Sequence, residues 1–347
     1  MESTFDFSKR FTPKRKLEFA QLLKSISRQI GFKVSSRGWC YIMEQKGLIN
    51  KDQFDRVADA INDLRRQGMI PVDFVAEESA RQFQGVEEEY DGDVDDVIGW
   101  MTRDVLNGGK YFTPDWWEDE EYYIQCVVEK IDLVTLFAPV CEKFKIPIAN
   151  SKGWSSILQR AEYARRFKEA EDKGLKCVLL YCGDHDPDGK RISETLRNNL
   201  EQVSEVTWGD GTDGYDPADL IIDRFGLNYD FIKANGFTWI DNLITGSGGN
   251  LASPRHPNHS LPYVQEYLRT IGERKCEANA IVTLPRVARA MVRQAIEKYL
   301  GEGAEQRFEE KMQARKDEYN ERLKEIGLYD IITDFQAGRN NEDEDDE

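Results

Sequence analysis

Three carboxylates lie within five residues in the stretch "YCGDHDPDG". They belong to Asp184, Asp186 and Asp188, and their negative charges repel one another. Pro187 and Gly189 disfavour a continuous helix, so the stretch is expected to form a turn. A cluster of this kind needs a compensating positive charge.

A hard cation would supply that charge. Ligand sets made only of oxygen atoms favour Mg²⁺ or Mn²⁺, which are held by few carboxylates while phosphate oxygens complete the coordination. Glu129 ends one apolar run, and the aspartates follow another. The sequence therefore predicts a metal site formed by Glu129, Asp184 and Asp186, with Asp188 as a further ligand.

Three other interpretations fit parts of the same turn. A calcium loop of the EF-hand type needs a glutamate where this chain has Thr195, and a helix where it has an apolar run, so we exclude it. A phosphotransferase with an aspartate nucleophile also places DxD after a strand. Alternatively, Asp188 caps a helix that begins near Lys190. The last two interpretations stay open.

The elements around these acids alternate between strands and helices. Apolar runs predict strands in "YYIQCVVEK", "IPIA" and "KCVLLYCGD", and the segments between them, "LVTLFAPVCEKF" and "SSILQRAEYARRFKEAEDKG", predict helices. Runs without polar alternation suit strands buried on both faces, which indicates a parallel sheet of βα units. Because the carboxyl ends of parallel strands share one edge, Glu129 is expected to meet Asp184 and Asp186 there.

The N-terminal region is basic, although the whole chain has a formal charge of −17. Residues 9–68 contain 14 basic and 6 acidic residues. Helical spacing predicts three helices, in 16–30, from Ser35 or Ser36 to Gln45, and in 52–68. The following "MIPVDFV" is expected to be extended, which completes the element order of a winged helix. A three-helix bundle gives the same pattern, but Arg56, Arg65 and Arg66 on the third helix favour a DNA-binding face.

The negative charge is concentrated elsewhere. Residues 72–99 contain ten acidic residues and one arginine, and the final "NEDEDDE" adds six acidic residues. A short helix is expected near 95–105, and one hypothesis is that segment 85–97 mimics nucleic acid and occupies the basic region. The segment "AEQRFEEKMQARKDEYNERLKEIG" predicts a polar helix that is solvated or forms a dimer contact.

Composition bounds the class of protein. With 347 residues and 40% hydrophobic content, the chain is expected to be globular. It contains no run of eighteen apolar residues and no signal-peptide core at its start, so we expect no membrane association and a cytoplasmic or nucleoid-associated location. Six cysteines without a CxxC pair are expected to be reduced core residues. His256 and His259 share a loop in which a zinc site is a further alternative.

The order of "VVEK", "ANSKGWSS" and "LLYCGDHDPDG" resembles a Toprim domain, whose signature is a Glu after the first strand and DxD after a later one. Together with the winged helix, it makes the chain similar to the A subunit of topoisomerase VI, to its meiotic break-forming relative, and to uncharacterised winged-helix/Toprim proteins of phages and bacteria. The resemblance covers about residues 16–200 and, more weakly, "GERKCEANAI" at 272–281. The α/β organisation expected is a winged helix in 1–84, an acidic linker in 85–121, a Toprim domain with an extension in 122–300, and a polar helix with an acidic tail in 301–347.

The resemblance also implies a nucleophile. The family uses a tyrosine in an R-x-x-x-Y context, and "RGWCY" supplies Arg37 and Tyr41. The family more often has two adjacent aromatic residues there, whereas Cys40 takes the first place in this chain. Tyr41 would form a 5′-phosphotyrosyl link while Mg²⁺ on the acids, including Glu129, stabilises the phosphate charge. A core tyrosine on the second helix is the alternative.

The predicted function is Mg²⁺-dependent breakage of double-stranded DNA by a homodimer, because each protomer would cut one strand. No GxxxxGK[ST] motif is present, so any energy coupling would come from a separate ATPase subunit. Lys152 and His185 are further candidates for phosphate contacts. The alternatives are a hydrolytic Toprim nuclease of the mobile-element or plasmid-defence type, in which metal ions activate water, and a catalytically silent DNA-binding adaptor.

Overall fold

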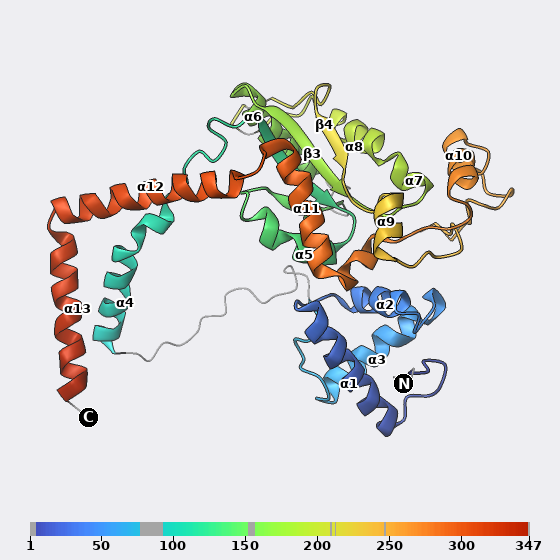
Figure 1. The fold of residues 1–347 in the computed structure, drawn as a ribbon, viewed down its shortest axis with the longest axis horizontal. Coiled ribbons are helices and arrows are strands. Elements are labelled where there is room, and N and C mark those ends of the chain that lie inside the picture. Colours follow the sequence, from blue (N-terminus) through green and yellow to red (C-terminus); the bar gives the residue numbers. More distant parts are fainter. Residues whose placement is uncertain are drawn as a thin grey trace. The chain divides into compact units, whose positions relative to one another are not determined.

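The computed structural model describes residues 5–76, 93–151, 157–208, 210–211, 213–245 and 248–345. These residues form a mixed α/β protein with a four-stranded parallel sheet (Figure 1). The chain divides into two compact units. Met1–Glu78 and Glu120–Leu300 make up the first, and Ser79–Asp119 and Gly301–Glu347 make up the second.

The sheet of the first unit has the strand order β2-β1-β3-β4, and every neighbouring pair is parallel. The strands are β1 (Tyr122–Val128), β2 (Ile148–Asn150), β3 (Lys176–Cys182) and β4 (Ile221–Arg224). Both long strands are buried almost throughout, which is why their sequences are continuous apolar runs. The prediction of a parallel α/β sheet is confirmed.

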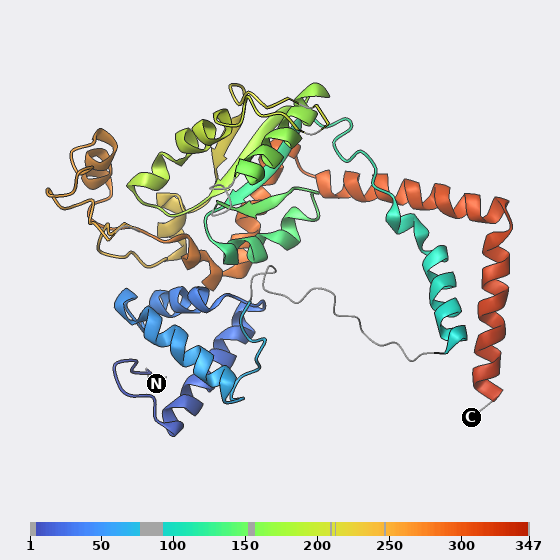
Figure 2. The ribbon, with the colours of Figure 1, turned by 180° about the vertical axis from the view of Figure 1, so that it is seen from behind.

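Helices cover both faces of this sheet. The helices are α5 (Ile131–Cys141), α6 (Ile157–Asp172), α8 (Ile192–Glu201) and α11 (Pro285–Leu300). The chain passes from β1 to β2 in one direction and then returns across β1 to β3 and β4, so right-handed crossovers place α5 on one face and α6 with α8 on the other (Figures 1 and 2). Helix α11 packs against α5.

Shorter elements follow the strands at the carboxyl edge of the sheet and beyond it. They are α7 (Pro187–Lys190), α9 (Tyr229–Asn235), α10 (Pro262–Thr270) and the 3₁₀ segment η5 (Ala278–Thr283).

The N-terminal region of the first unit contains the three predicted helices. They are α1 (Pro13–Ile30), α2 (Ser36–Gln45) and α3 (Phe54–Arg66), and a 3₁₀ turn, η1 (Lys51–Gln53), precedes the third. The Ser35 hydroxyl accepts a hydrogen bond from the Gly38 amide and so caps α2, as the sequence predicts.

The prediction of an extended strand in "MIPVDFV" is wrong. Residues 69–75 form turns, in which the Phe74 amide donates to the Pro71 carbonyl at 3.1 Å. The Val72 carbonyl accepts from Arg65 Nε at 2.7 Å, and Pro71 has no amide hydrogen to offer a neighbouring strand. Residues 5–76 therefore contain helices and no strand, which is the arrangement of the three-helix alternative.

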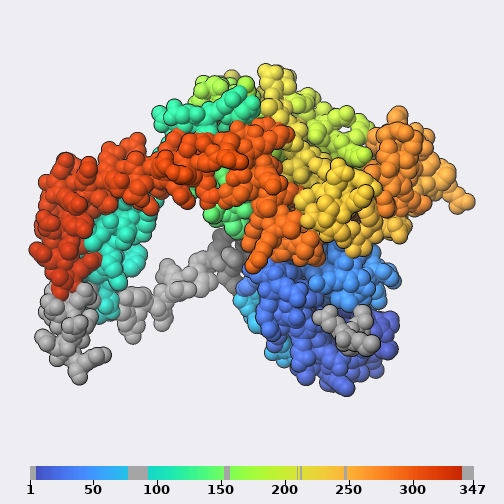
Figure 3. Space-filling view, viewed as in Figure 1, coloured from blue at the N-terminus to red at the C-terminus, as the bar shows by residue number. Residues whose placement is uncertain are grey.

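The N-terminal helices are attached to the sheet part of the same unit. The buried Asp132 of α5 accepts the Ser35 amide at 2.8 Å and the Ser35 hydroxyl at 3.2 Å. Gly38 packs so closely on this carboxylate that an added Cβ would lie 2.1 Å from it. Helix α2 also contacts η5, and Figure 3 shows the blue N-terminal helices against the orange segment that contains η5.

The second unit is helical in its described residues. It contains α4 (Val94–Leu106), η3 (Gly108–Tyr111), α12 (Ala304–Glu325) and α13 (Leu328–Asp345). The short helix near 95–105 and the polar helix now seen as α12 are confirmed. The acidic tail expected after α12 continues as helix α13 as far as Asp345. Segment 85–97 was proposed to mimic nucleic acid, and most of it, residues 85–92, lies outside the described residues.

Two further findings concern the cysteines and the apolar length of the helices. All six cysteines are free and buried, as predicted. Among the described residues, no helix is both long enough and apolar enough to cross a bilayer.

The attachment of α2 makes a prediction for stability. Replacing Asp132 by alanine leaves the Ser35 amide without its acceptor, and we expect a loss of about 1–3 kcal/mol in the free energy of unfolding, measured by urea titration. Asp132→Asn keeps one acceptor oxygen and should lose less. Equal stability of wild type and Asp132→Ala would show that this contact does not hold α2.

Candidate active site

Two of the predicted acids meet at the carboxyl edge of the sheet. Strands β1 and β3 are neighbours, and Val128 pairs with Cys182 at their last positions. Glu129 follows β1 and donates its amide to the Cys182 carbonyl at 2.9 Å. The Asp184 amide in turn donates to Glu129 Oε2 at 2.7 Å. The structure thus brings together two acids that are 55 residues apart.

A lysine compensates the charge of these two acids. Lys130 Nζ lies 2.7 Å from Glu129 Oε1 and 3.0 Å from Asp184 Oδ2, so its ammonium group bridges the two carboxylates. The sequence analysis did not select Lys130, although its position directly after Glu129 was a signal that could have found it. The positive charge that the acidic cluster needs is therefore partly supplied by the chain itself.

This bridge controls the protonation of the site. Burial raises the pKa of Asp184, with Lys130 opposing the shift. Burial would also raise the pKa of Glu129, but the Lys130 charge and the Asp184 amide outweigh it, and the pKa is lowered. For Lys130, burial is outweighed by Asp184 and Glu129, and its pKa is raised. Lys130 stays protonated at neutral pH.

The other two aspartates have different environments. Asp186 Oδ1 accepts the Gly189 amide at 2.6 Å and caps α7, so the helix cap is Asp186 and not Asp188. Burial, followed by the charge of Asp184, raises the pKa of Asp186 to about 7. Asp188 is exposed and accepts the Tyr263 hydroxyl at 2.9 Å.

The fit of this site to a metal ion depends on Lys130. Within the described ranges, no group of three or more His, Cys, Asp or Glu side chains is arranged to hold a metal ion. Glu129 and Asp184 have the oxygen chemistry that suits a hard cation, but the Lys130 ammonium lies between them. A metal ion would have to displace that ammonium.

Arg224, at the end of β4, holds the backbone of the acidic turn. Its Nη2 donates to the Asp184 carbonyl at 2.7 Å and to the Gly183 carbonyl at 3.3 Å, and its Nη1 donates to the Gly189 carbonyl. The sequence analysis missed this residue. A single basic residue at the carboxyl end of the apolar run "LIIDR" was the available signal.

The segment "GERKCEANAI" also lies at the site. Cys276 forms an antiparallel bridge with His185, and the Ala278 amide donates to Asp184 Oδ1 at 2.7 Å. Between them, the buried Glu277 forms ion pairs with Lys51 of η1 and with Lys275, the latter at 3.3 Å. This segment, which carried the weaker part of the resemblance, therefore contacts the acidic turn directly.

Tyr41 shares a cavity with the acids. A cavity of about 670 Å³ is lined from the N-terminal side by Arg37, Tyr41 and Lys51, and from the sheet side by residues that include Glu129, Lys130, Asp184, Asp186 and Glu277. Burial, followed by the charge of Glu277, raises the pKa of Tyr41, while Lys130 and Lys51 oppose the shift. The ring of Tyr41 packs edge-on against Phe54 at 5.0 Å.

The arginines predicted to bind DNA have mixed environments. Arg56 donates to the carbonyls of Ser8 and Lys9 at 3.1 and 2.7 Å, so its guanidinium group holds the N-terminal segment. Arg65 is likewise bonded to the Val72 carbonyl. Arg66 is exposed, and its guanidinium group lies 3.9 Å from Asp63. Of these three side chains, Arg66 is the one most open to a phosphate.

The two remaining candidate phosphate contacts are Lys152 and His185. Lys152 lies outside the described residues. His185 is 4% exposed and packs between Trp239 and Tyr267, and burial, with the charge of Arg224, lowers its pKa to about 4. A neutral, buried imidazole is not placed to contact DNA, so the prediction for His185 is corrected to a core position.

Three comparisons with known proteins found no match for this chain. No family model matches the chain, no curated protein matches it, and no solved structure matches it.

Proposed function

We propose that the protein breaks double-stranded DNA by transesterification at Tyr41, in the manner of a topoisomerase VI A subunit. The observation that supports this proposal most is the shared cavity. Tyr41 and Arg37 line it from α2, and Glu129, Asp184 and Asp186 line it from the sheet. A candidate nucleophile, a guanidinium group and three carboxylates thus line one cavity.

In this mechanism the Tyr41 oxygen attacks a backbone phosphorus, the 3′ oxygen leaves and takes up a proton, and the 5′ end becomes a phosphotyrosyl ester. The phenolic proton needs an acceptor. Glu277 lines the same cavity as Tyr41, and we assign its carboxylate as the acceptor of that proton. Arg37 and Lys51 supply positive charge for the phosphate oxygens.

Glu129, Asp184 and Asp186 would hold Mg²⁺ or Mn²⁺, which when bound stabilises negative charge on the phosphate. In this proposal Lys130 neutralises Glu129 and Asp184 and also holds their carboxylates in place until the ion binds. The proposal includes DNA as the partner of the basic N-terminal helices, a homodimer that cuts both strands, and a separate ATPase subunit for any energy coupling. A cytoplasmic or nucleoid-associated location belongs to the same proposal.

A hydrolytic Toprim nuclease is the second candidate. The observation in its favour is the raised pKa of Tyr41, caused mainly by burial, because a neutral phenol is a poor nucleophile unless a base accepts its proton. In this alternative the carboxylates and their ion activate water, and Tyr41 serves only to pack against Phe54.

Substitution of Tyr41 by phenylalanine separates the two candidates. The variant keeps the ring packing and deletes the hydroxyl, so under transesterification it should bind DNA but produce no breaks in supercoiled plasmid with Mg²⁺ or Mn²⁺. Wild-type breaks should carry protein on their 5′ ends, detected by end-labelling after denaturation. Tyr229→Phe, at an exposed tyrosine, is the matched control. Cleavage with free ends by Tyr41→Phe would favour hydrolysis.

The bridge by Lys130 predicts a linkage between metal and stability. Lys130→Met leaves Glu129 and Asp184 without their ammonium partner, so the variant should unfold at a lower temperature than wild type in EDTA. A bound ion replaces the missing charge, and millimolar Mg²⁺ should raise the melting temperature of the variant more than that of wild type. Lys24→Met, at an exposed lysine, is the control. An equal Mg²⁺ response in all three proteins would argue against a metal at this site.

The pKa of Asp186 predicts how metal binding depends on pH. Its carboxyl group has a pKa of about 7 and must lose its proton to bind a cation. Mn²⁺ affinity, measured by calorimetry, should therefore rise about tenfold between pH 6 and pH 8. In Asp186→Asn the affinity should be weaker and should change less over this range. A wild-type affinity that does not change with pH would remove Asp186 from the ligand set.

A further inference from the structure

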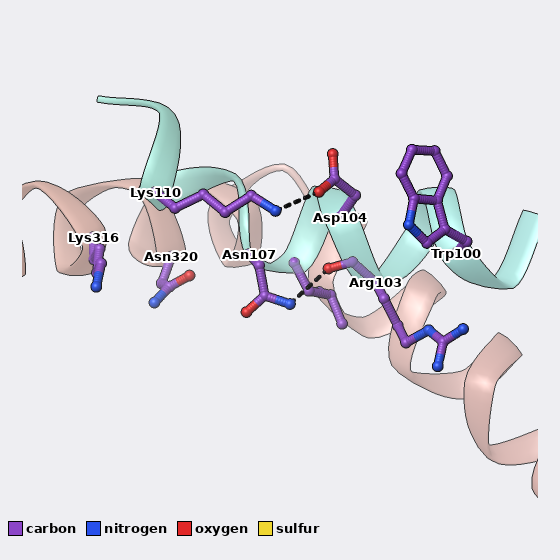
Figure 4. Close-up of a pocket in the computed structure, with 9 residues that line it drawn as sticks. Trp100, Arg103, Asp104, Asn107, Lys110, Lys316 and Asn320 are labelled. Atoms are coloured by element: carbon purple, nitrogen blue, oxygen red, sulfur yellow. Dashed lines mark hydrogen bonds and ion pairs between the residues drawn. The ribbon is translucent and has the colours of Figure 1, made fainter. Parts of the chain in front are cut away.

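Buried charge outside the acidic turn is concentrated where the N-terminal helices meet the sheet part of the first unit. Among the described residues, five Asp, Glu, Lys or Arg side chains are buried, and Asp132, Lys275 and Glu277 are three of them. All three lie at this contact, which we call the N-terminal junction. The hollow of about 420 Å³ in the second unit contains none of the five, and its exposed Lys110 pairs with Asp104 at 2.6 Å (Figure 4). Because burial penalises charge, protonation has a larger effect at the N-terminal junction than in this hollow.

Two glutamates from distant parts of the chain lie at the N-terminal junction. Glu44 lies on α2, about one turn after Tyr41, and Glu277 lies directly before η5, which α2 contacts. Each has a buried Oε2 atom that accepts no hydrogen bond from any described residue. The charge of Glu277 acts on the carboxyl group of Glu44. A buried carboxylate without a partner is unfavourable unless it takes up a proton.

The two lysines of the N-terminal junction are bound to Glu277. Lys51 of η1 forms an ion pair with Glu277 Oε1, and Lys275 Nζ lies 3.3 Å from the same oxygen. Lys275 also donates to the Ile244 carbonyl at 2.7 Å. Glu44 forms no ion pair within the part of the chain that the structure describes. Of the two acids, Glu277 therefore keeps its negative charge and Glu44 takes the proton.

The electrostatics of Glu44 agree with this division. Burial, followed by the charge of Glu277, raises the pKa of Glu44 to about 7, while Lys51 and Lys275 oppose the shift. These three charged groups face Glu44 from η1 and from the segment before η5. Glu44 is therefore largely protonated below neutral pH and ionised above it.

The other elements around α2 place their charges near the start of the helix. On α3, Asp55 forms an ion pair with Arg37 at 3.5 Å, and on α5, Asp132 accepts the Ser35 amide at 2.8 Å. Arg37 and Ser35 lie at the start of α2, whereas Glu44 lies in its last turn. Protonation in this last turn is therefore governed by the acid and the two lysines described above.

We propose that Glu44 makes the contact between α2 and the segment before η5 pH-sensitive, so that the contact is firm while Glu44 carries a proton and is loosened when the proton leaves. Ionised Glu44 places a second negative charge near Glu277, whose two lysines are already bound. Opening the contact returns both carboxyl groups to water and relieves the repulsion. Because α2 carries Tyr41 to the cavity, the proton on Glu44 controls how firmly Tyr41 is held there. This control is independent of the proposed DNA breakage.

The direction of the pH effect follows from the raised pKa of Glu44. In the open state the carboxyl group is in water and has its ordinary pKa of about 4.5, whereas in the closed contact the pKa is about 7. Between these two values the closed contact binds the proton more tightly than the open state does. The stability of the contact therefore falls as the pH rises from about 4.5 to about 7 and is constant above that range, with a change in the opening constant of at most about tenfold per pH unit.

Hydrogen exchange of the full chain tests this proposal. Between pH 5.5 and pH 7.5, after correction for the intrinsic pH dependence of exchange, the amides of α2 should lose about tenfold more protection in wild type than in Glu44→Gln, which cannot ionise. Asp186 also has a pKa of about 7, so the measure is the difference between the two proteins. Glu18→Gln, at an exposed glutamate of α1, is the matched control and should keep the wild-type response.

A second measurement identifies the proton site directly. In an NMR titration of the protein with ¹³C-labelled glutamate, one carboxyl signal should titrate near pH 7, and that signal should be missing from Glu44→Gln. Equal losses of α2 protection in wild type and Glu44→Gln would overturn the proposal. A Glu44 signal that titrates near pH 4.5 would overturn it as well.

Discussion

The ion bridge from Lys130 to Glu129 and Asp184 is the interaction on which the rest of the site depends. Neighbouring parallel strands end side by side, so the acids that follow them are forced close together. Two carboxylates in a buried position repel one another strongly unless positive charge lies between them. Lys130 supplies that charge, and the Asp184 amide supplies a hydrogen bond to Glu129. An acidic edge can therefore form before any ligand arrives.

The acidic turn that carries Asp184 needs partners for its charge and its carbonyl groups, and distant parts of the chain supply them. Arg224 binds the turn's carbonyl groups from β4, and the Ala278 amide takes the second oxygen of Asp184. Glu277, which lies next to Ala278, forms an ion pair with Lys51. This ion pair links the segment beside the turn to the N-terminal region. Together with the contact between Asp132 and Ser35, this fixes α2 and places Tyr41 at the cavity.

Charge is divided unevenly between the two units. In the sequence, the first unit contains 37 acidic and 37 basic residues and is formally neutral, so the second unit carries the whole net charge of −17. The negative total therefore does not describe the unit that contains the cavity. The negatively charged second unit should repel a polyanion such as DNA at long range. The first unit is formally neutral and can offer local positive surface, such as Arg66 on α3.

Local patterns in the sequence determined most of the elements. Uninterrupted apolar runs and helical spacing depend only on neighbouring residues, so the strands β1 to β3, the three N-terminal helices and α12 were all predictable. The meeting of Glu129 and Asp184 followed as well, because parallel strands must end at a common edge. Tertiary structure alone decided that the Lys130 ammonium also reaches Asp184, 54 residues further along the chain, and that Arg56 binds the carbonyls of Ser8 and Lys9. These outcomes depend on which groups far apart in the chain satisfy one another's charges and hydrogen bonds once packing is complete, and no local pattern encodes that choice.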